Sequence, residues 1–245
     1  MSEDKSKSID VFGVKPLADS VNTVTKATMD GAGAFLSRIC LPAAEEFGLL
    51  LKDKVSRWRA QNLIRICEQS EKMIEKHQPL TNVYAHPRLV TATIESGSWA
   101  DHDKVQGMWA GLLASSCTED GKDESNLLFI NLLSQITSSE ALIFNHACES
   151  VEKTVSQGGW INGGQIIVEL NDLIKLTLVM DIHRLDRELD HLRSLDLMHG
   201  GFDPNSTSAR LMPTPLGLHM YVRCQGYVGS PIDYFGIRTE PDNNS

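Results

Sequence analysis

The segment Leu41-Pro42-Ala43-Ala44-Glu45-Glu46-Phe47-Gly48, which leads into Lys54-Val55-Ser56-Arg57-Trp58-Arg59-Ala60-Gln61-Asn62-Leu63, decides the fold class. Pro42 stands where a helix loses no hydrogen bond by lacking an N–H, and the acidic pair after it favours the positive end of the helix dipole. Apolar residues then recur on one face as far as Ile74, with charged residues opposite them. We therefore expect one long amphipathic helix over residues 43–77.

The chain before this helix divides into two parts. Residues 1–15 carry no repeating apolar face, so we expect a disordered arm there. Residues 17–27 repeat apolar side chains every three or four positions, which predicts an amphipathic helix. Gly31 and Gly33 are expected to break or bend that helix.

Two helix starts are predicted after the long helix. Ser98 and Asp101 resemble a capping box, in which a side chain at each end of a four-residue motif accepts a backbone N–H. The helix they would open carries a W-A-G-L-L-A stripe from Trp109. Thr137 and Glu140 form a second capping box, for a helix that runs through Cys148.

The C-terminal part begins after the glycine-rich stretch Gly158–Gly164, which interrupts the helical pattern. Asp181 is the expected N-cap of an apolar-faced helix, and a hairpin is expected with strands over Leu195–Met198 and Arg210–Met212. Thr214 then caps a last helix. Helix, helix, apolar-faced helix, hairpin and helix is the order of a winged helix-turn-helix; the alternative is an all-helical extension with one irregular hairpin.

We therefore predict a mainly α fold, with an N-terminal helical bundle built on the long amphipathic helix. A C-terminal winged-helix-like domain with a small β-hairpin follows it. The predicted division is an arm over residues 1–15, a helical domain over 16–125, a winged-helix-like domain over 126–230 and a flexible tail over 231–245.

Composition limits the class of protein. The formal net charge of the 245 residues is −9, which argues against diffuse binding to nucleic acid. Five widely spread cysteines without a C-x-x-C pair indicate reduced thiols in a cytoplasmic protein. The polar first residues do not resemble a secretory signal, and no apolar run approaches the roughly 20 residues that span a bilayer. We expect no stable membrane insertion.

No motif in the sequence indicates an enzyme, a cofactor or a metal. The densest polar stretch, Asp181–His191, contains His183 and His191, but their spacing is unlike that of helical zinc ligands. A metal or general-base site is one interpretation of this stretch. The favoured interpretation is that these residues form the solvated face of an amphipathic helix. Cys117 and Cys148 lack the surroundings of catalytic cysteines, so packed thiols are expected.

A DNA-reading surface is the alternative for this part of the chain. Four arginines would contact DNA in a winged helix: Arg184, Arg187, Arg193 and Arg210. Acidic residues interleaved along the same helix offset most of this charge, whereas DNA readers surround their base contacts with Lys and Arg. Nucleic acid is therefore not favoured, and a winged helix used for protein contacts is preferred.

A candidate protein interface lies near the start of the long helix, formed by Arg57, Trp58, Arg59 and Asn62. Arg and Trp are frequent at interfaces, because they combine a large contact area with hydrogen bonding. In the alternative, Trp58 belongs to the core, and the two arginines pair with acids such as Asp53 and Glu46.

The segment Leu41–Glu75 contains a proline, an acidic pair, a glycine and Arg-Trp-Arg in that order. In this it resembles the abortive infection alpha (Abi-alpha) family of bacterial and phage-associated proteins. Met108–Ala114 and Leu211–Gly217 also resemble that family. The resemblance implies a helical architecture with a winged-helix-like C-terminal part and a link to phage defence. It implies no catalytic residues.

The function expected from these features is that of a non-enzymatic sensor or regulator in bacterial antiphage defence. It would bind a protein partner and form a homodimer through the long helix. One alternative is a DNA-binding transcriptional regulator. A second is a membrane-acting toxin effector that uses the N-terminal helices.

Overall fold

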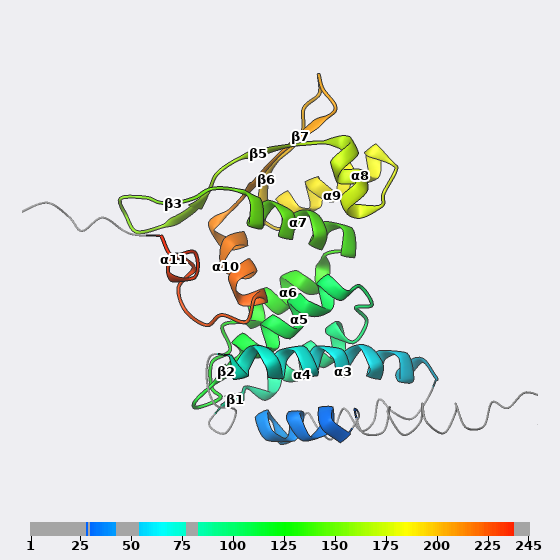
Figure 1. The fold of residues 1–245 in the computed structure, drawn as a ribbon, viewed down its shortest axis with the longest axis vertical. Coiled ribbons are helices and arrows are strands. Elements are labelled where there is room, and N and C mark those ends of the chain that lie inside the picture. Colours follow the sequence, from blue (N-terminus) through cyan, green and yellow to red (C-terminus); the bar gives the residue numbers. More distant parts are fainter. Residues whose placement is uncertain (1–27, 29, 43–53, 77–82, 238–245) are drawn as a thin grey trace, which may run out of the picture.

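The computed structural model of the protein describes residue 28 and residues 30–42, 54–76 and 83–237, although residues 54–57 are described by their backbone alone. This part of the chain is mainly helical with small antiparallel sheets (Figure 1). The labelled helices are α3 (Lys54–Glu75), α4 (Pro87–Gly97), α5 (Asp103–Ser115), α6 (Leu127–Gln135), α7 (Ser138–Ser150), α8 (Leu170–Thr177), α9 (Ile182–Ser194), α10 (Pro215–Cys224) and α11 (Pro231–Tyr234). The strands are β1 (Tyr84–Ala85), β2 (Cys117–Thr118), β3 (Lys153–Val155), β4 (Ile161–Gly163), β5 (Ile166–Glu169), β6 (Met198–Phe202) and β7 (Ser208–Pro213).

Helix α3 organises the lower half of Figure 1, where it packs against α5. It lies inside the helix predicted over residues 43–77, and residues 43–53 of that prediction fall outside the described part. The apolar stripe is buried, with Leu63 and Ile66 fully covered and Cys67 almost so. Because this stripe faces the core of its own chain, the described part of α3 does not present it to a second subunit.

Residues 30–39 form an uninterrupted helix, so the predicted break at Gly31 and Gly33 is wrong. Glycine costs a helix interior about 1 kcal/mol relative to alanine, which is a weak preference that packing can override. Here Phe35 and Leu36 are at most 1% exposed, so tertiary burial holds the helix together across both glycines. The helix predicted over residues 17–27 lies outside the described residues.

Of the two capping boxes predicted from the sequence, one is confirmed and one is wrong. Thr137 and Glu140 form both hydrogen bonds of a capping box at the start of α7, as expected. The helix expected from Ser98 and Asp101 instead begins later, because the side chain of His102 accepts the N–H of Lys104 and caps α5. Ser98 is the C-cap of the preceding helix, α4.

The upper half of Figure 1 contains a three-stranded antiparallel sheet in the order β5-β7-β6, with α7, α8 and α9 around it. The expected hairpin is present as β6 and β7, but its first strand starts at Met198 rather than Leu195. Leu195 is instead the C-cap of α9, and the N–H of Leu197 still bonds the Leu192 carbonyl. Strand β5 was not anticipated, since its apolar residues run directly into those of α8.

Helix α10 joins the two halves of the molecule. Its N-cap is Thr214, as predicted, and it packs against both α5 and α7. Gly111 makes this approach close, because a Cβ at that position would lie 1.8 Å from the Cys224 carbonyl oxygen. One connected cluster of buried apolar side chains therefore runs through both halves.

The segment after α10 folds back on it. Pro231 is buried, and the Phe235 ring stacks on Tyr221 at 6.1 Å between centroids. Part of the segment predicted as a flexible tail is thus a packed helix, α11, because its aromatic side chains have a surface to cover. None of the described helices has the length and hydropathy needed to cross a membrane.

Candidate interaction surface

Trp58 and Trp99 lie side by side on the surface. Trp58 stands in the first turns of α3, and Trp99 follows the C-cap of α4. Their ring centroids are 6.1 Å apart, at an interplanar angle of 59°. Trp58 is 40% exposed and Trp99 is 54% exposed, so two of the largest apolar side chains in the protein face outward together. The alternative in which Trp58 belongs to the core is wrong.

Arg59 is fixed against this tryptophan pair. Its guanidinium carbon lies 4.4 Å from the centre of the Trp99 ring, within the range of a cation–π interaction. Its Nε donates to the Ser98 hydroxyl at 3.0 Å, and its Nη2 donates to the Glu95 carbonyl at 3.3 Å. Among the described residues Arg59 forms no ion pair, and three contacts to residues 95–99 hold its guanidinium in place.

Asn62 supports this surface from beneath. It is 3% exposed, and its amide donates to the Ser98 carbonyl at 3.0 Å while its oxygen accepts from Gln106 at 3.3 Å. These bonds connect α3 and α5 to the end of α4 that carries Trp99. Asn62 therefore positions the surface and does not lie on it. The side chain of Arg57 lies outside the described atoms, as do Glu46 and Asp53.

We call Trp58, Arg59 and Trp99 the Trp–Arg–Trp patch. Sequence reasoning found its first two members and missed Trp99, which is 40 positions further along the chain. Ser98-Trp99 stands between two helices, and an exposed aromatic residue in such a loop was the available signal.

The four arginines of the alternative DNA surface are mostly paired with acids. Arg184 bonds Glu188 at 2.9 Å, Arg193 bonds Asp190 at 2.6 Å and Arg210 bonds Asp203 at 3.4 Å. Arg187 alone of the four has no ion pair within the described part of the chain. The structure therefore does not gather these arginines into one free basic surface.

Helix α9 is less solvated than predicted, because two carboxylates are buried between it and α7. Glu188 is 5% exposed and accepts from the Ser139 hydroxyl at 2.8 Å. Glu140, at 2% exposed, lies 2.7 Å from the His191 ring nitrogen. No set of three or more His, Cys, Asp or Glu residues with metal-binding geometry occurs in the described ranges.

The cysteines match the expectation of packed thiols. All five are free and buried. Burial raises the pKa of Cys117 to about 12, and it raises the pKa of Cys224 as well. Reactive cysteines have a lowered pKa and some exposure, so these thiols have the properties of core residues.

A comparison with models of known protein families shows to which family the chain belongs. A family model described as "Abortive infection alpha" matches residues 59–211, which is more than half of the sequence. The chain belongs to the abortive infection alpha family. The resemblance predicted from the sequence is thereby confirmed. The match contains Arg59, Trp99 and α9, whereas Trp58 lies one residue before it. No curated protein and no solved structure matches the chain.

Proposed function

We propose that this protein is a non-enzymatic sensor or regulatory component of bacterial abortive infection, which acts by binding a protein partner in the cytoplasm. The name of its family links it to phage defence. Five buried, unpaired thiols are in keeping with a reducing compartment.

The Trp–Arg–Trp patch is the observation that carries this proposal. Trp and Arg are the residue types most enriched among interface hot spots. Here both tryptophans are already exposed, and Arg59 is held in one geometry by Ser98, Glu95 and the Trp99 ring. A partner would therefore meet an ordered surface and would lose little side-chain entropy on binding. An acidic group beside an apolar side chain fits this chemistry.

An affinity pull-down of the tagged protein from infected and uninfected cells tests the proposal, with a nuclease-treated arm in parallel. Trp99→Ala and Trp58→Ala are compared with Trp160→Ala, which removes a tryptophan that is 72% exposed in the β3–β4 turn. We expect a discrete protein partner that survives nuclease, persists with Trp160→Ala and is lost with Trp99→Ala.

Phage plating on the same strains gives the functional readout. Trp99→Ala should remove protection, whereas Trp160→Ala should keep it. Full protection and full partner recovery by both Trp58→Ala and Trp99→Ala would contradict the proposed surface.

A second candidate is a winged-helix DNA-binding regulator, and the order of the C-terminal elements favours it. Strand β5, helices α8 and α9 and the hairpin β6–β7 follow one another, and the sheet order is β5-β7-β6. In this interpretation α9 is the helix that would enter the major groove. The ion pairs of Arg184, Arg193 and Arg210 weigh against DNA binding, so we rank this function second.

Mobility shift with genomic fragments separates the two functions. If the protein reads DNA, Arg187→Ala should abolish a salt-sensitive shift and leave partner recovery unchanged. If it acts through protein contacts alone, neither the wild type nor Arg187→Ala should shift DNA at physiological salt.

A further inference from the structure

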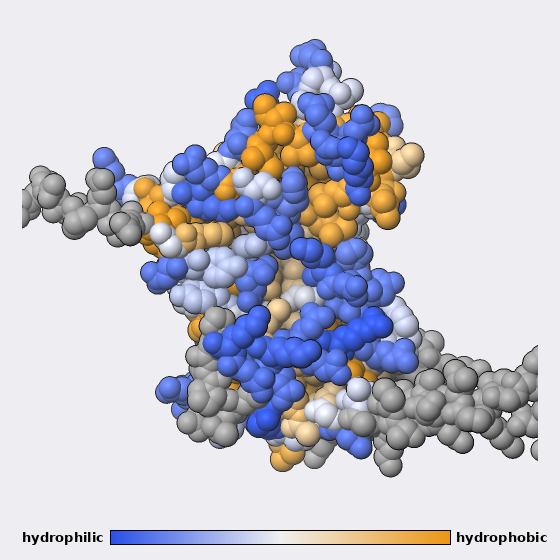
Figure 2. Space-filling model, viewed as in Figure 1, coloured by the Kyte–Doolittle hydropathy of each residue, from blue (hydrophilic) through white to orange (hydrophobic). Residues whose placement is uncertain are grey.

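A cavity of about 290 Å³ lies where the two halves of the molecule meet. Its walls come from α3 and α5 in the lower half, from α7 in the upper half and from the C-terminal end of α10 (Figure 1). Figure 2 shows that the described part of the molecule narrows between these halves. Pockets that hold small ligands measure roughly 300–1,000 Å³, so this cavity has room for one compact molecule.

The lining of the cavity combines apolar residues with one buried amide. Met73, Met108 and Cys224 are among the apolar residues, and the amide belongs to Asn145, which is 5% exposed. The Asn145 nitrogen donates to the Ala141 carbonyl at 2.8 Å and to the Met108 sulfur, so both of its N–H groups are used. Its Oδ1 accepts no hydrogen bond from any described residue. A donor on a bound molecule would satisfy this oxygen.

Gly107 keeps the cavity open on the side of α5. Glycine in a helix interior costs about 1 kcal/mol relative to alanine, so it usually has a packing reason. At Gly111, one turn later, crowding by the Cys224 carbonyl is that reason. A Cβ at position 107 would instead meet only the Gln69 Oε1, at 3.5 Å. The fold does not require glycine at this position, and what the missing side chain provides is space in the cavity.

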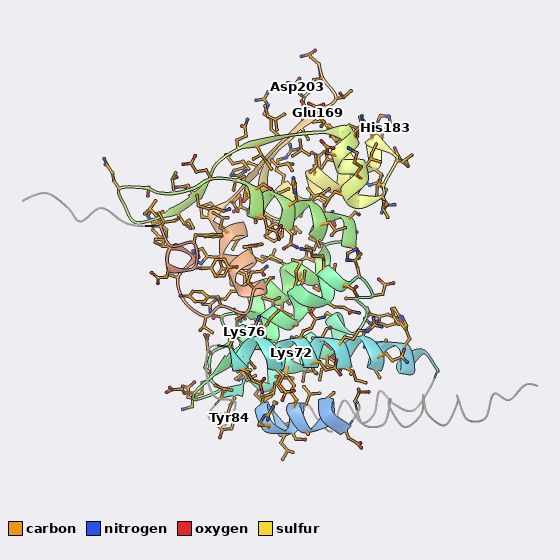
Figure 3. All side chains as sticks on the ribbon, viewed as in Figure 1. Lys72, Lys76, Tyr84, Glu169, His183 and Asp203 are labelled. Carbon is orange, nitrogen blue, oxygen red and sulfur yellow. The ribbon has the colours of Figure 1, made fainter. Side chains whose placement is uncertain are left out.

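The charged residues of the lining are two acids and one base: Asp103, Glu149 and Lys104. Lys104 lies 3.7 Å from Glu149, so these two charges offset each other. Asp103 forms no ion pair with any described residue. Lys72 and Lys76 stand on the same part of α3 as the cavity wall (Figure 3), but they are not among the lining residues. The lining therefore has an excess of negative charge, which favours a cation.

We propose that this cavity binds a small organic amine. Its ammonium group lies beside Asp103, and its apolar body lies against Met73 and Met108. An ammonium group has three N–H donors, enough for the Asp103 carboxylate and the free Asn145 oxygen. The cavity is separate from the Trp–Arg–Trp patch, so this proposal stands or fails independently of the proposed partner surface.

Calorimetric titration of the full chain with phenethylamine and with hexylamine tests the site. Phenethyl alcohol and phenylacetate are neutral and anionic controls of similar size. We expect saturable binding of one amine molecule per chain, about 10-fold weaker binding of the alcohol and no binding of phenylacetate. The amines should also raise the melting temperature, because they bind the folded state alone.

Gly107→Leu separates the cavity from the rest of the surface. The leucine side chain fills the space beside α5, and leucine is also the better helix former, so amine binding should be lost at an unchanged or higher melting temperature. Gly33→Leu is the matched control, because Gly33 is a second helical glycine with no described atom within 4 Å of a Cβ. This variant should bind the amines as the wild type does.

Asp103→Asn tests the charge. Amine binding should fall about 10-fold, to the level of the alcohol, while binding of the alcohol stays unchanged. Asp101→Asn, which neutralises an exposed acid outside the lining, should have no effect. Failure of both amines to bind the wild type saturably would overturn the proposal. Equal binding of amine, alcohol and phenylacetate would overturn it too, as would wild-type affinity in Gly107→Leu.

Discussion

The guanidinium of Arg59 lies 4.4 Å from the centre of the Trp99 ring and joins α3 to the C-terminal end of α4. Ser98 reinforces this link, since its hydroxyl accepts from Arg59 and its carbonyl accepts from the buried Asn62. The exposed part of the patch and its buried support therefore meet at a single residue. A substitution in the exposed part can change binding with little effect on the fold.

Replacing Arg59 by lysine keeps the charge but removes the planar group that lies over Trp99. A surface cation–π contact is worth about 0.5–1 kcal/mol and the hydrogen bond to the buried Ser98 about as much, so the free energy of unfolding should fall by about 1–2 kcal/mol. Partner recovery should fall much further, because lysine does not hold a fixed geometry on the ring. Urea unfolding and the pull-down together check this. An equal loss in both measurements would mean that the residue acts through stability alone.

Removing the Glu188 carboxylate should destabilise the contact between α7 and α9. Glu188→Ala deletes the acceptor of both Ser139 and Arg184 in a buried position, which should cost about 1–3 kcal/mol in the free energy of unfolding. The matched control is Asp190→Ala, which breaks the exposed ion pair with Arg193 and should cost less than about 1 kcal/mol. Chemical denaturation of the two variants measures the difference, and equal costs would count against a structural role for Glu188.

Two glycine-to-alanine substitutions should have opposite effects. Gly111→Ala places a methyl group against the Cys224 carbonyl, with no flexible side chain to give way, and should cost about 3 kcal/mol or more. Gly33→Ala meets no described atom within 4 Å inside a helix and should stabilise the protein by about 0.5–1 kcal/mol. The melting temperatures of the two variants test both expectations. A lower melting temperature for Gly33→Ala would show that the helix over residues 30–39 is crowded at this position.

Stability should fall at alkaline pH because of the buried thiols. The unfolded chain releases the Cys117 proton near its ordinary pKa of 9.0, whereas burial raises the pKa in the fold to about 12. The folded state therefore keeps this proton at pH values where the unfolded chain has released it. The free energy of unfolding then falls as pH rises above 9, by up to about 1.4 kcal/mol per pH unit. Urea unfolding between about pH 8 and pH 10.5 should show a shallower fall for Cys117→Ala than for the wild type. Parallel slopes would contradict this assignment.

Local signals in the sequence predicted most of the helices. The Thr137 capping box, the Asp181 cap and the Thr214 cap depend on residues within four positions of each other, so no long-range information was needed. The sequence failed where a distant partner decides the outcome. Trp99 lies in the patch where Asn62 and Arg59 bond the neighbouring Ser98, and Glu188 is buried where the Ser139 hydroxyl of α7 donates to it.

Strand β5 shows a different limit. Ile166, Ile167 and Val168 continue without a break into the apolar residues of α8, so hydrophobic periodicity does not mark where the strand ends. The end of the strand is fixed instead by its pairing with β7, which joins positions 39 to 45 residues apart. The hairpin boundary shifted for a related reason, since α9 extends through Ser194 and its C-cap, Leu195, occupies the first position of the predicted strand.

The close approach of Gly111 to the end of α10 bears on how the protein is made. One side of this contact is Gly111, and the other is Cys224, which follows it in the chain by more than 100 residues. During translation, the surface of α5 that receives α10 stays uncovered until residues 215–224 have left the ribosome. Its apolar side chains are exposed for that interval, which is the period when nascent chains are most prone to aggregate. A truncation before α10 should therefore yield a nascent product that recruits chaperones, in place of a smaller folded protein.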